Sequence, residues 1–281
     1  MRLGIAIAME EFIRDRLLSI KSMGFDNIQL LMWEPKYWTD EWLQVLKDVL
    51  DETGIEVTVL WAGFDPPVAW NFIDGPITVG LVPEAYRDRR VTQILKGARF
   101  AHDLGVKNVA SHLGFLPEDP NDPLYTGTLA AVNYIAKELN HRGQNLLFET
   151  GQETPTTLLR LFSDLEKRGT TNVGVNFDPA NLLAYGKANP IDAVYVLAPY
   201  IKGVHAKDAN YPTCGYQLGL EVPIGEGMVN FPRFISALKE VGYDGFVTIE
   251  REIECEEPMM VNPVAQVIMD ARDLLLPLLE S

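Results

Sequence analysis

Short apolar runs alternate with longer amphipathic stretches from one end of this 281-residue sequence to the other. The runs have the length of buried strands. The longer stretches repeat apolar residues at steps of three and four, as helices with one packed side do. The predicted strands are 2–8, 27–32, 55–62, 107–112, 145–149, 173–178, 201–206 and 245–250. The predicted helices are 10–22, 40–52, 84–104, 125–141, 155–167, 190–198, 231–241 and 261–279.

Glycines at the ends of several predicted helices support this alternation. Gly24, Gly54, Gly105 and Gly242 each stand just before a predicted strand, where a glycine commonly ends a helix. Eight strand–helix pairs in a chain of this length predict an α/β protein with one domain over residues 1–281, a (β/α)8 TIM barrel. A doubly wound open sheet is the alternative, but no Gly-x-Gly-x-x-Gly motif follows the first strand.

Four consecutive predicted strands end on an ionisable side chain: Glu149, Asp178, His205 and Glu250. Alternate residues of a strand point to opposite faces, so in 173–178 the apolar face holds Val173, Val175 and Phe177, and Asp178 falls on the polar one. The apolar faces suit a helix layer. Because the site of a (β/α)8 barrel lies at the C-terminal ends of its strands, the four groups are expected to converge there.

Composition narrows the possible partners and the compartment. The net charge of −15, from 24 basic and 39 acidic residues, disfavours nucleic acid as a partner, because phosphate binding needs a basic surface. No apolar stretch approaches the roughly 18–20 residues that span a bilayer, so no membrane association is expected. Two cysteines, Cys214 and Cys255, make no disulfide framework and fit a cytoplasmic protein.

The chemistry of the four strand-end groups favours a metal site. Two glutamates, one aspartate and one histidine suit Mn²⁺ or Mg²⁺ with open positions, and Co²⁺ or Zn²⁺ less specifically. Three carboxylates brought together without a cation would repel one another and raise their pKa values. One divalent ion, Mn²⁺ first, is therefore the expected cofactor. The alternative is that each acid is an ordinary strand-end or helix-cap residue.

Several segments resemble the sugar phosphate isomerase/epimerase family of xylose-isomerase-like TIM barrels, a group with ketose 3-epimerases, hydroxypyruvate isomerase-like enzymes and inosose dehydratases. The resembling segments are 148–153, 176–182, 205–208, 224–227 and 248–250. The resemblance implies that Glu149, Asp178, His205 and Glu250 are metal ligands, and that Glu149 and Glu250 also accept and donate the proton. It also makes a homodimer or homotetramer plausible.

The chain departs from the family pattern at Asn181, where many relatives have a histidine after Asp-x-x. This departure weakens the relation to type IV apurinic endonucleases, which need several histidines for a multi-zinc cluster. The favoured hypothesis is a metal-dependent isomerase or epimerase of a ketose or related polyol or hydroxy-keto sugar. It would act by carboxylate proton transfer through a metal-stabilised enediolate. The alternatives are a metal-dependent dehydratase of an inosose- or shikimate-type substrate and a non-catalytic sugar- or metal-binding barrel.

Further residues are candidates for binding a small sugar, each with a purely structural alternative. They are His112, Glu153, Asn181, Lys207, Glu226 and Trp61. For Lys207 the alternative is an ion pair with a nearby acid, and for Glu226 a turn position. No clear basic pair for a phosphate group is found, which favours an unphosphorylated substrate. The longest predicted loops, 62–82 and 209–229, are rich in Pro, Gly and aromatics and are expected to cover the site.

Overall fold

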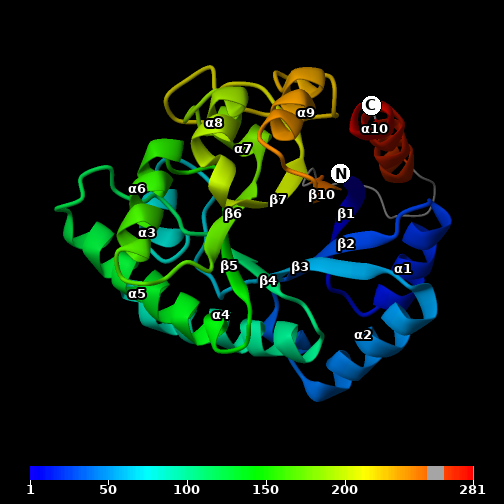
Figure 1. The fold of residues 1–281 in the computed structure, drawn as a ribbon, viewed down its shortest axis with the longest axis horizontal. Coiled ribbons are helices and arrows are strands. Elements are labelled where there is room, and N and C mark those ends of the chain that lie inside the picture. The colour runs from blue at the N-terminus through cyan, green and yellow to red at the C-terminus, as the bar shows by residue number, and fades with distance from the viewer. Residues whose placement is uncertain (252–262, 281) are drawn as a thin grey trace.

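A closed barrel of parallel strands forms the centre of the protein (Figure 1). This computed structural model describes residues 1–251 and 263–280. The barrel strands are β1 (Arg2–Ala8), β2 (Asn27–Met32), β3 (Glu56–Ala62), β4 (Asn108–Ser111), β5 (Asn145–Glu149), β6 (Val173–Phe177), β7 (Ile201–Ala206) and β10 (Phe246–Ile249). They follow chain order around the barrel, and β1 closes it by pairing with β10. The predicted (β/α)8 fold is confirmed.

A helix layer surrounds the strands. Its main helices are α1 (Ile13–Ser22), α2 (Asp40–Thr53), α4 (Glu84–Asp103), α5 (Pro123–Asn140), α6 (Pro155–Glu166), α8 (Pro190–Leu197), α9 (Phe231–Glu240) and α10 (Pro263–Glu280). Helix α10 returns to pack beside β1 and β10, which brings the two ends of the chain to one side (Figure 1). Positions 261 and 262 of the last predicted helix, and Cys255, lie outside the described residues.

Side-chain caps explain where many of these helices begin. At five helix starts the side chain of the preceding residue accepts a hydrogen bond from a backbone N–H of the first turn, which satisfies a donor that has no partner inside the helix. These capping residues are Thr39, Asp122, Thr154, Asn189 and Asn230. At the other end of α2, Gly54 has the left-handed φ of 66° that glycine adopts most readily.

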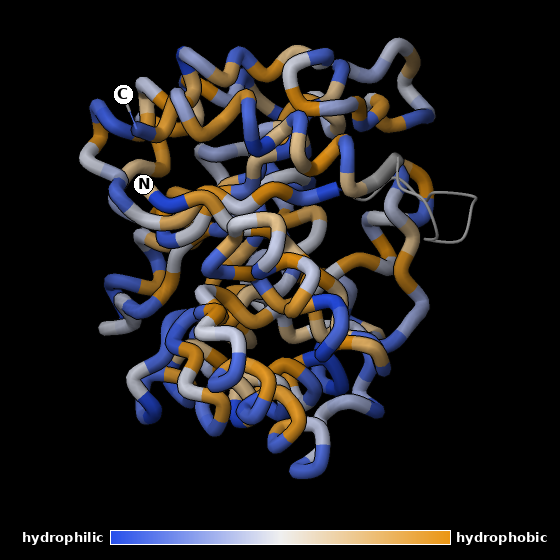
Figure 2. Tube along the Cα trace, turned by 90° about the vertical axis from the view of Figure 1, so that its right-hand side faces the viewer, coloured by the Kyte–Doolittle hydropathy of each residue, from blue (hydrophilic) through white to orange (hydrophobic). Residues whose placement is uncertain are grey.

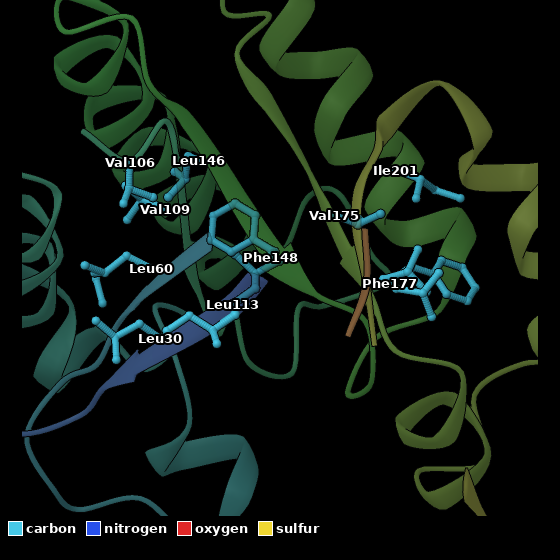
Figure 3. Packing of buried hydrophobic residues seen from close by; sticks show 14 of the residues in the cluster. Leu30, Leu60, Val106, Val109, Leu113, Leu146, Phe148, Val175, Phe177 and Ile201 are labelled. Carbon is cyan, nitrogen blue, oxygen red and sulfur yellow. The ribbon is translucent and has the colours of Figure 1, made fainter. Parts of the chain in front are cut away.

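The main hydrophobic core lies between the strands and the helices. Leu146, Phe148, Val175 and Phe177 contribute to it from neighbouring strands, as Figure 3 shows. Along the helices, hydrophobic and hydrophilic residues alternate, as expected of helices with one buried side (Figure 2). The predicted apolar faces are thus confirmed for these strands. A second, small cluster lies inside the barrel and contains Val59, Trp61, Ala110 and Leu147.

Short elements not predicted from the sequence lie in the loops after the strands and, in the case of η2, between α8 and β7. They are η1 (Pro35–Tyr37), α3 (Gly75–Thr78), α7 (Pro179–Ala184), η2 (Ala198–Tyr200) and the antiparallel pair β8 (Asp208–Ala209) and β9 (Glu221–Val222). Each is too short to show a period in the sequence. Within the described part of the chain, no helix is long and apolar enough to cross a membrane.

Candidate metal centre and active site

The four strand-end groups come together at the C-terminal ends of β5, β6, β7 and β10. One ligand atom from each of Glu149, Asp178, His205 and Glu250 lies within 4.8 Å of the others. His205 Nδ1 is 2.8 Å from Glu149 Oε1, 3.0 Å from Glu250 Oε2 and 3.5 Å from Asp178 Oδ2. All four residues are buried. The alternation of side chains along these parallel strands therefore places the four groups together, as predicted.

Three atoms of this group fit a divalent ion because they are buried and have no hydrogen-bond partner. They are Glu149 Oε1, Asp178 Oδ2 and His205 Nδ1. The carboxylate oxygens lie close to Nδ1, but the three atoms satisfy no hydrogen bond there. Such orphaned buried atoms are rare and unfavourable in proteins. A cation that accepts a lone pair from each would satisfy all of them, and this mixture of carboxylate oxygens and one imidazole nitrogen suits ions such as Mn²⁺, Mg²⁺, Co²⁺ or Zn²⁺.

A buried hydrogen-bond network inside the barrel determines which nitrogen of His205 faces the carboxylates. Trp61 Nε1 donates to Gln29 Oε1 at 2.8 Å, and Gln29 Nε2 donates to Asn176 Oδ1 at 2.9 Å. An indole N–H can only donate, so the Gln29 atom facing it must be the oxygen. That same oxygen lies 2.9 Å from His205 Nε2. In the neutral imidazole of His205 the Nε2 atom therefore carries the proton, which leaves the lone pair of Nδ1 for a cation.

The pKa values in the group reflect its excess of buried negative charge. Burial, together with the nearby Glu250 carboxylate, raises the pKa of Glu149 to about 8. Burial alone would lower the pKa of His205, but Glu250 and then the other carboxylates raise it well above its usual value. Burial alone would raise the pKa of Glu250, yet His205 and Lys207 hold it well below its usual range. The group thus attracts positive charge.

A cavity of about 320 Å³ adjoins this group at Glu149. Glu149, His112 and Lys207 line its inner end, and Asn181, Tyr185 and Trp70 are among the residues that line its walls. A space of this size, with polar groups at the base and aromatic rings at the sides, is suited to a small polar ligand.

Two candidates at the inner end, His112 and Lys207, contact the two glutamates. His112 Nδ1 lies 3.5 Å from Glu149 Oε2, and burial lowers the pKa of His112 to about 3, so its ring is neutral. The His112 ring stacks on Trp33, with centroids 5.5 Å apart. Lys207 Nζ donates to Glu250 Oε2 at 3.1 Å, which is the ion pair considered as the alternative for this lysine.

The other four candidates differ in how close they come to the cavity. Asn181 lines it, and its backbone N–H donates to Asp178 Oδ1 at the start of α7. Glu153 is buried with both carboxylate oxygens unpartnered, and burial raises its pKa to about 8. Trp61 lies inside the barrel below the cavity, because β3 continues through it. Glu226 is exposed on a turn and is not among the residues lining the cavity.

Asp208 was not predicted as a site residue, yet it organises the loop beside the site. Its buried carboxylate accepts hydrogen bonds from the backbone N–H groups of Ala209, Gly225, Gly227 and Val229, at 2.9 to 3.0 Å. A Cβ at Gly227 would lie 2.2 Å from Asp208 Oδ1, so the glycine allows this close approach. The Gly-Glu-Gly sequence around Glu226 therefore has a structural purpose.

Gln29 and Tyr185 are further residues whose positions sequence reasoning missed. Gln29 offered one signal, a polar side chain between the apolar residues Ile28 and Leu30 within a strand. Tyr185 offered none, because α7, the short helix that leads to it, shows no period. Its ring packs against Phe72 and Phe115 at the edge of the cavity.

Comparison with known proteins supports the barrel fold and shows the family to which the chain is related. The family model described as xylose isomerase-like TIM barrel matches residues 17–276. A solved xylose isomerase domain protein from Planctomyces limnophilus is 31% identical, with 98% of this chain and 95% of that chain covered and a TM-score of 0.87. A putative L-ribulose-5-phosphate 3-epimerase of Escherichia coli strain K12 is 25% identical over 283 residues, covering 96% of each.

A D-tagatose 3-epimerase-like protein of known structure shares the fold at 21% identity. Its TM-score is 0.74, with 100% of this chain and 97% of that chain covered. The family model covers most of the barrel strands and all four residues of the buried group. The chain therefore belongs to the xylose isomerase-like TIM barrel family.

Proposed function

We propose that this protein is a divalent-metal-dependent isomerase or epimerase of a ketose or a related hydroxy-keto sugar. The observation that carries the proposal is the buried group of Glu149, Asp178, His205 and Glu250 at the base of a cavity suited to a small polar ligand. The names of relatives, among them a putative ribulose-phosphate 3-epimerase and a tagatose 3-epimerase-like protein, point to the same reaction class.

The two glutamates are suited to move a proton next to a sugar carbonyl. Glu149 Oε1 faces His205 and its Oε2 faces the neutral His112, while Glu250 Oε2 is held by Lys207. One carboxylate would remove the proton from the carbon beside the carbonyl, and the other would return it. Return on the opposite face inverts the centre, whereas return to the neighbouring carbon isomerises the sugar. A bound divalent ion would supply the positive charge that stabilises the enediolate.

The cavity favours a substrate without a phosphate group. Within the described residues, Lys207 is the only cation that lines the cavity, and it pairs with Glu250. A phosphate there would compete with a carboxylate for the same ammonium group. We therefore infer a neutral sugar, in contrast to the phosphorylated sugar in the name of the Escherichia coli relative. Mn²⁺ is the ion we expect first, because three of the four ligands are carboxylates.

Proton exchange with solvent tests the proposal most directly. The protein, loaded with Mn²⁺, is incubated in D₂O with a panel of ketoses, and deuterium in the recovered sugars is measured by NMR and mass spectrometry. Exchange with inversion or isomerisation is the expected result, and Glu250→Gln is expected to lose about 10²–10⁴-fold of the exchange rate. Glu226→Gln, an exposed glutamate on a nearby turn, is the matched control and should behave like the parent.

Two outcomes would contradict the proposal. The first is a Glu250→Gln variant that still binds metal and exchanges protons at the rate of the parent. The second is a product that has lost water, which would identify a dehydratase instead. Metal content, measured by elemental analysis with Asp178→Ala alongside, checks the cofactor separately. About one ion per chain is expected in the parent, with a clear loss in the variant.

A further inference from the structure

A second hollow lies directly outside the cavity above the buried group. This outer groove has a volume of about 710 Å³, and Trp70, Leu218 and Gly219 line both spaces. Backbone lines their junction at Gly219, where a Cβ would lie only 1.8 Å from the carbonyl oxygen of Asn210. Because the two spaces share these lining residues, a ligand seated at the glutamates can extend into the outer groove.

The lining of the outer groove has the chemistry of a carbohydrate site. Three aromatic rings, Trp70, Tyr211 and Tyr216, are 43%, 41% and 76% exposed and can pack on the C–H face of a sugar ring. Asn71, Asn210 and Gln217 line the same groove, and their amides can donate to and accept from hydroxyl groups. Among the described residues that line it, none is charged. This absence disfavours a phosphate or an acidic ligand.

The two walls of the groove come from the loops 62–82 and 209–229, and both are held by hydrogen bonds. On one wall, buried Arg90 donates to the carbonyl oxygens of Pro67 and Gly80. On the other wall, the N–H of Asn210 donates to the carbonyl of Leu220 at 2.9 Å. The groove is therefore formed before a ligand arrives, which reduces the entropy lost on binding.

We propose that the substrate is a glycosylated hydroxy-keto sugar with two units. The ketose unit would lie at Glu149 and Glu250, and a second sugar, attached at the end remote from the carbonyl, would lie in the outer groove. The glycosidic bond stays intact, because the reaction is still the transfer of one proton between carbons of the ketose. The placement of the ketose unit rests on the proposed function, whereas the placement of the second sugar rests on the lining of the outer groove.

The test compares matched pairs of ligands that differ only in the second sugar. Each ketose of a panel, including D-fructose, is paired with its 6-O-glucosyl and 6-O-galactosyl derivatives, such as isomaltulose. Dissociation constants for the Mn²⁺-loaded protein come from calorimetry, and saturation-transfer NMR identifies which ring contacts the protein. At least one glycosylated ketose is expected to bind about tenfold more tightly than its own ketose, with contacts on the second ring.

A double variant locates the effect. In Tyr211→Ala with Tyr216→Ala, the preference for the glycosylated ketose over its ketose is expected to fall toward one. Tyr134→Ala, which removes an exposed tyrosine from the outer helix α5, is the control and should keep the preference of the parent. Thermal unfolding followed by circular dichroism verifies that each variant is folded.

Several outcomes would overturn this inference. The first is that no glycosylated ketose binds more tightly than its own ketose. The second is that no pair shows measurable binding. The third is that the double variant keeps the preference of the parent. A double variant that converts a dimer to a monomer in sedimentation would assign the groove to a second copy of the chain. Preferential binding without proton exchange by any sugar would instead leave the groove in place and refute the proposed isomerase or epimerase.

Discussion

The hydrogen-bond network around Gln29 predicts that a residue outside the metal ligand set controls metal affinity. The Gln29 oxygen accepts from both Trp61 Nε1 and His205 Nε2, and this arrangement turns Nδ1 toward the carboxylates, where it would be the ligand atom. Gln29→Met keeps the length of the side chain but removes both its acceptor and its donor. The imidazole of His205 can then adopt the other tautomer or rotate away from the carboxylates.

The magnitude follows from the contacts that are lost. Removing a partner that orients a metal-binding histidine weakens metal affinity by about 10–100-fold, or roughly 1.4–2.7 kcal/mol. Folding is affected as well, because Trp61 Nε1, His205 Nε2 and Asn176 Oδ1 lose their partner in a buried place. Each unsatisfied group costs about 1–3 kcal/mol. The variant is therefore expected to be several kcal/mol less stable without metal, unless a water enters.

Metal titration measures this effect without reference to any substrate. Co²⁺ is added to the metal-free protein and followed by its visible absorption, and Mn²⁺ affinity is obtained by competition. Gln29→Glu is the matched control, since its carboxylate still accepts from Trp61 and His205, and Asn176, whose Nδ2 has no partner, can turn its amide to donate to it. This variant should retain most of the affinity. A folded Gln29→Met variant that binds Co²⁺ and Mn²⁺ as tightly as the parent would refute this role for Gln29.

Two further predictions concern buried carboxylates near the site. Burial raises the pKa of Glu153 from 4.5 to about 8, so its contribution to stability is full below pH 4.5 and is lost as the pH rises through 8. Glu153→Gln should therefore gain stability relative to the parent between pH 5 and 8, by at most about 5 kcal/mol. Urea unfolding at several pH values measures this gain, and a difference that does not change with pH would contradict it. Asp208→Ala leaves the N–H groups of Gly225 and Gly227 without their acceptor, so their amides should exchange faster with deuterium and stability should fall by about 1–3 kcal/mol or more. Protection equal to that of the parent would show that Asp208 does not hold this loop.

The convergence of the four site groups was predictable because it depends on local rules alone. In β6 the apolar residues alternate with Gly174 and Asn176, and the period of two assigns Asp178 to the inner face. Parallel strands in chain order then bring the ends of β5, β6 and β7 side by side. Element ends were less predictable. Helix α1, for example, begins at Ile13 rather than at residue 10, because a turn occupies the residues before it.

The support for the site could not be predicted, because its contacts join residues far apart in the sequence. Gln29 and Asn176 are separated by 147 positions, and no local pattern pairs them. Trp61 was a candidate for substrate contact because it stands near the end of a strand. The predicted strand 55–62 included Trp61, but its contacts could not be predicted: its side chain lies on the inner face beside Val59 and donates to Gln29. Glu226 was a candidate because two glycines flank it. In the structure the backbone N–H groups of these glycines donate to Asp208 instead.

Under the proposed function, the residues that would carry the chemistry and those that would choose the substrate stand on different parts of the barrel. Glu149, His205 and Glu250 stand at strand ends, where pairing within the barrel fixes their positions. The aromatic and amide residues of the outer groove stand on loops, which can change length and composition without moving a strand. A family relationship through the barrel therefore transfers the proton-transfer chemistry more securely than the substrate. For this reason a glycosylated ketose can be the substrate here even though the names of two relatives, a putative L-ribulose-5-phosphate 3-epimerase and a D-tagatose 3-epimerase-like protein, refer to single sugars.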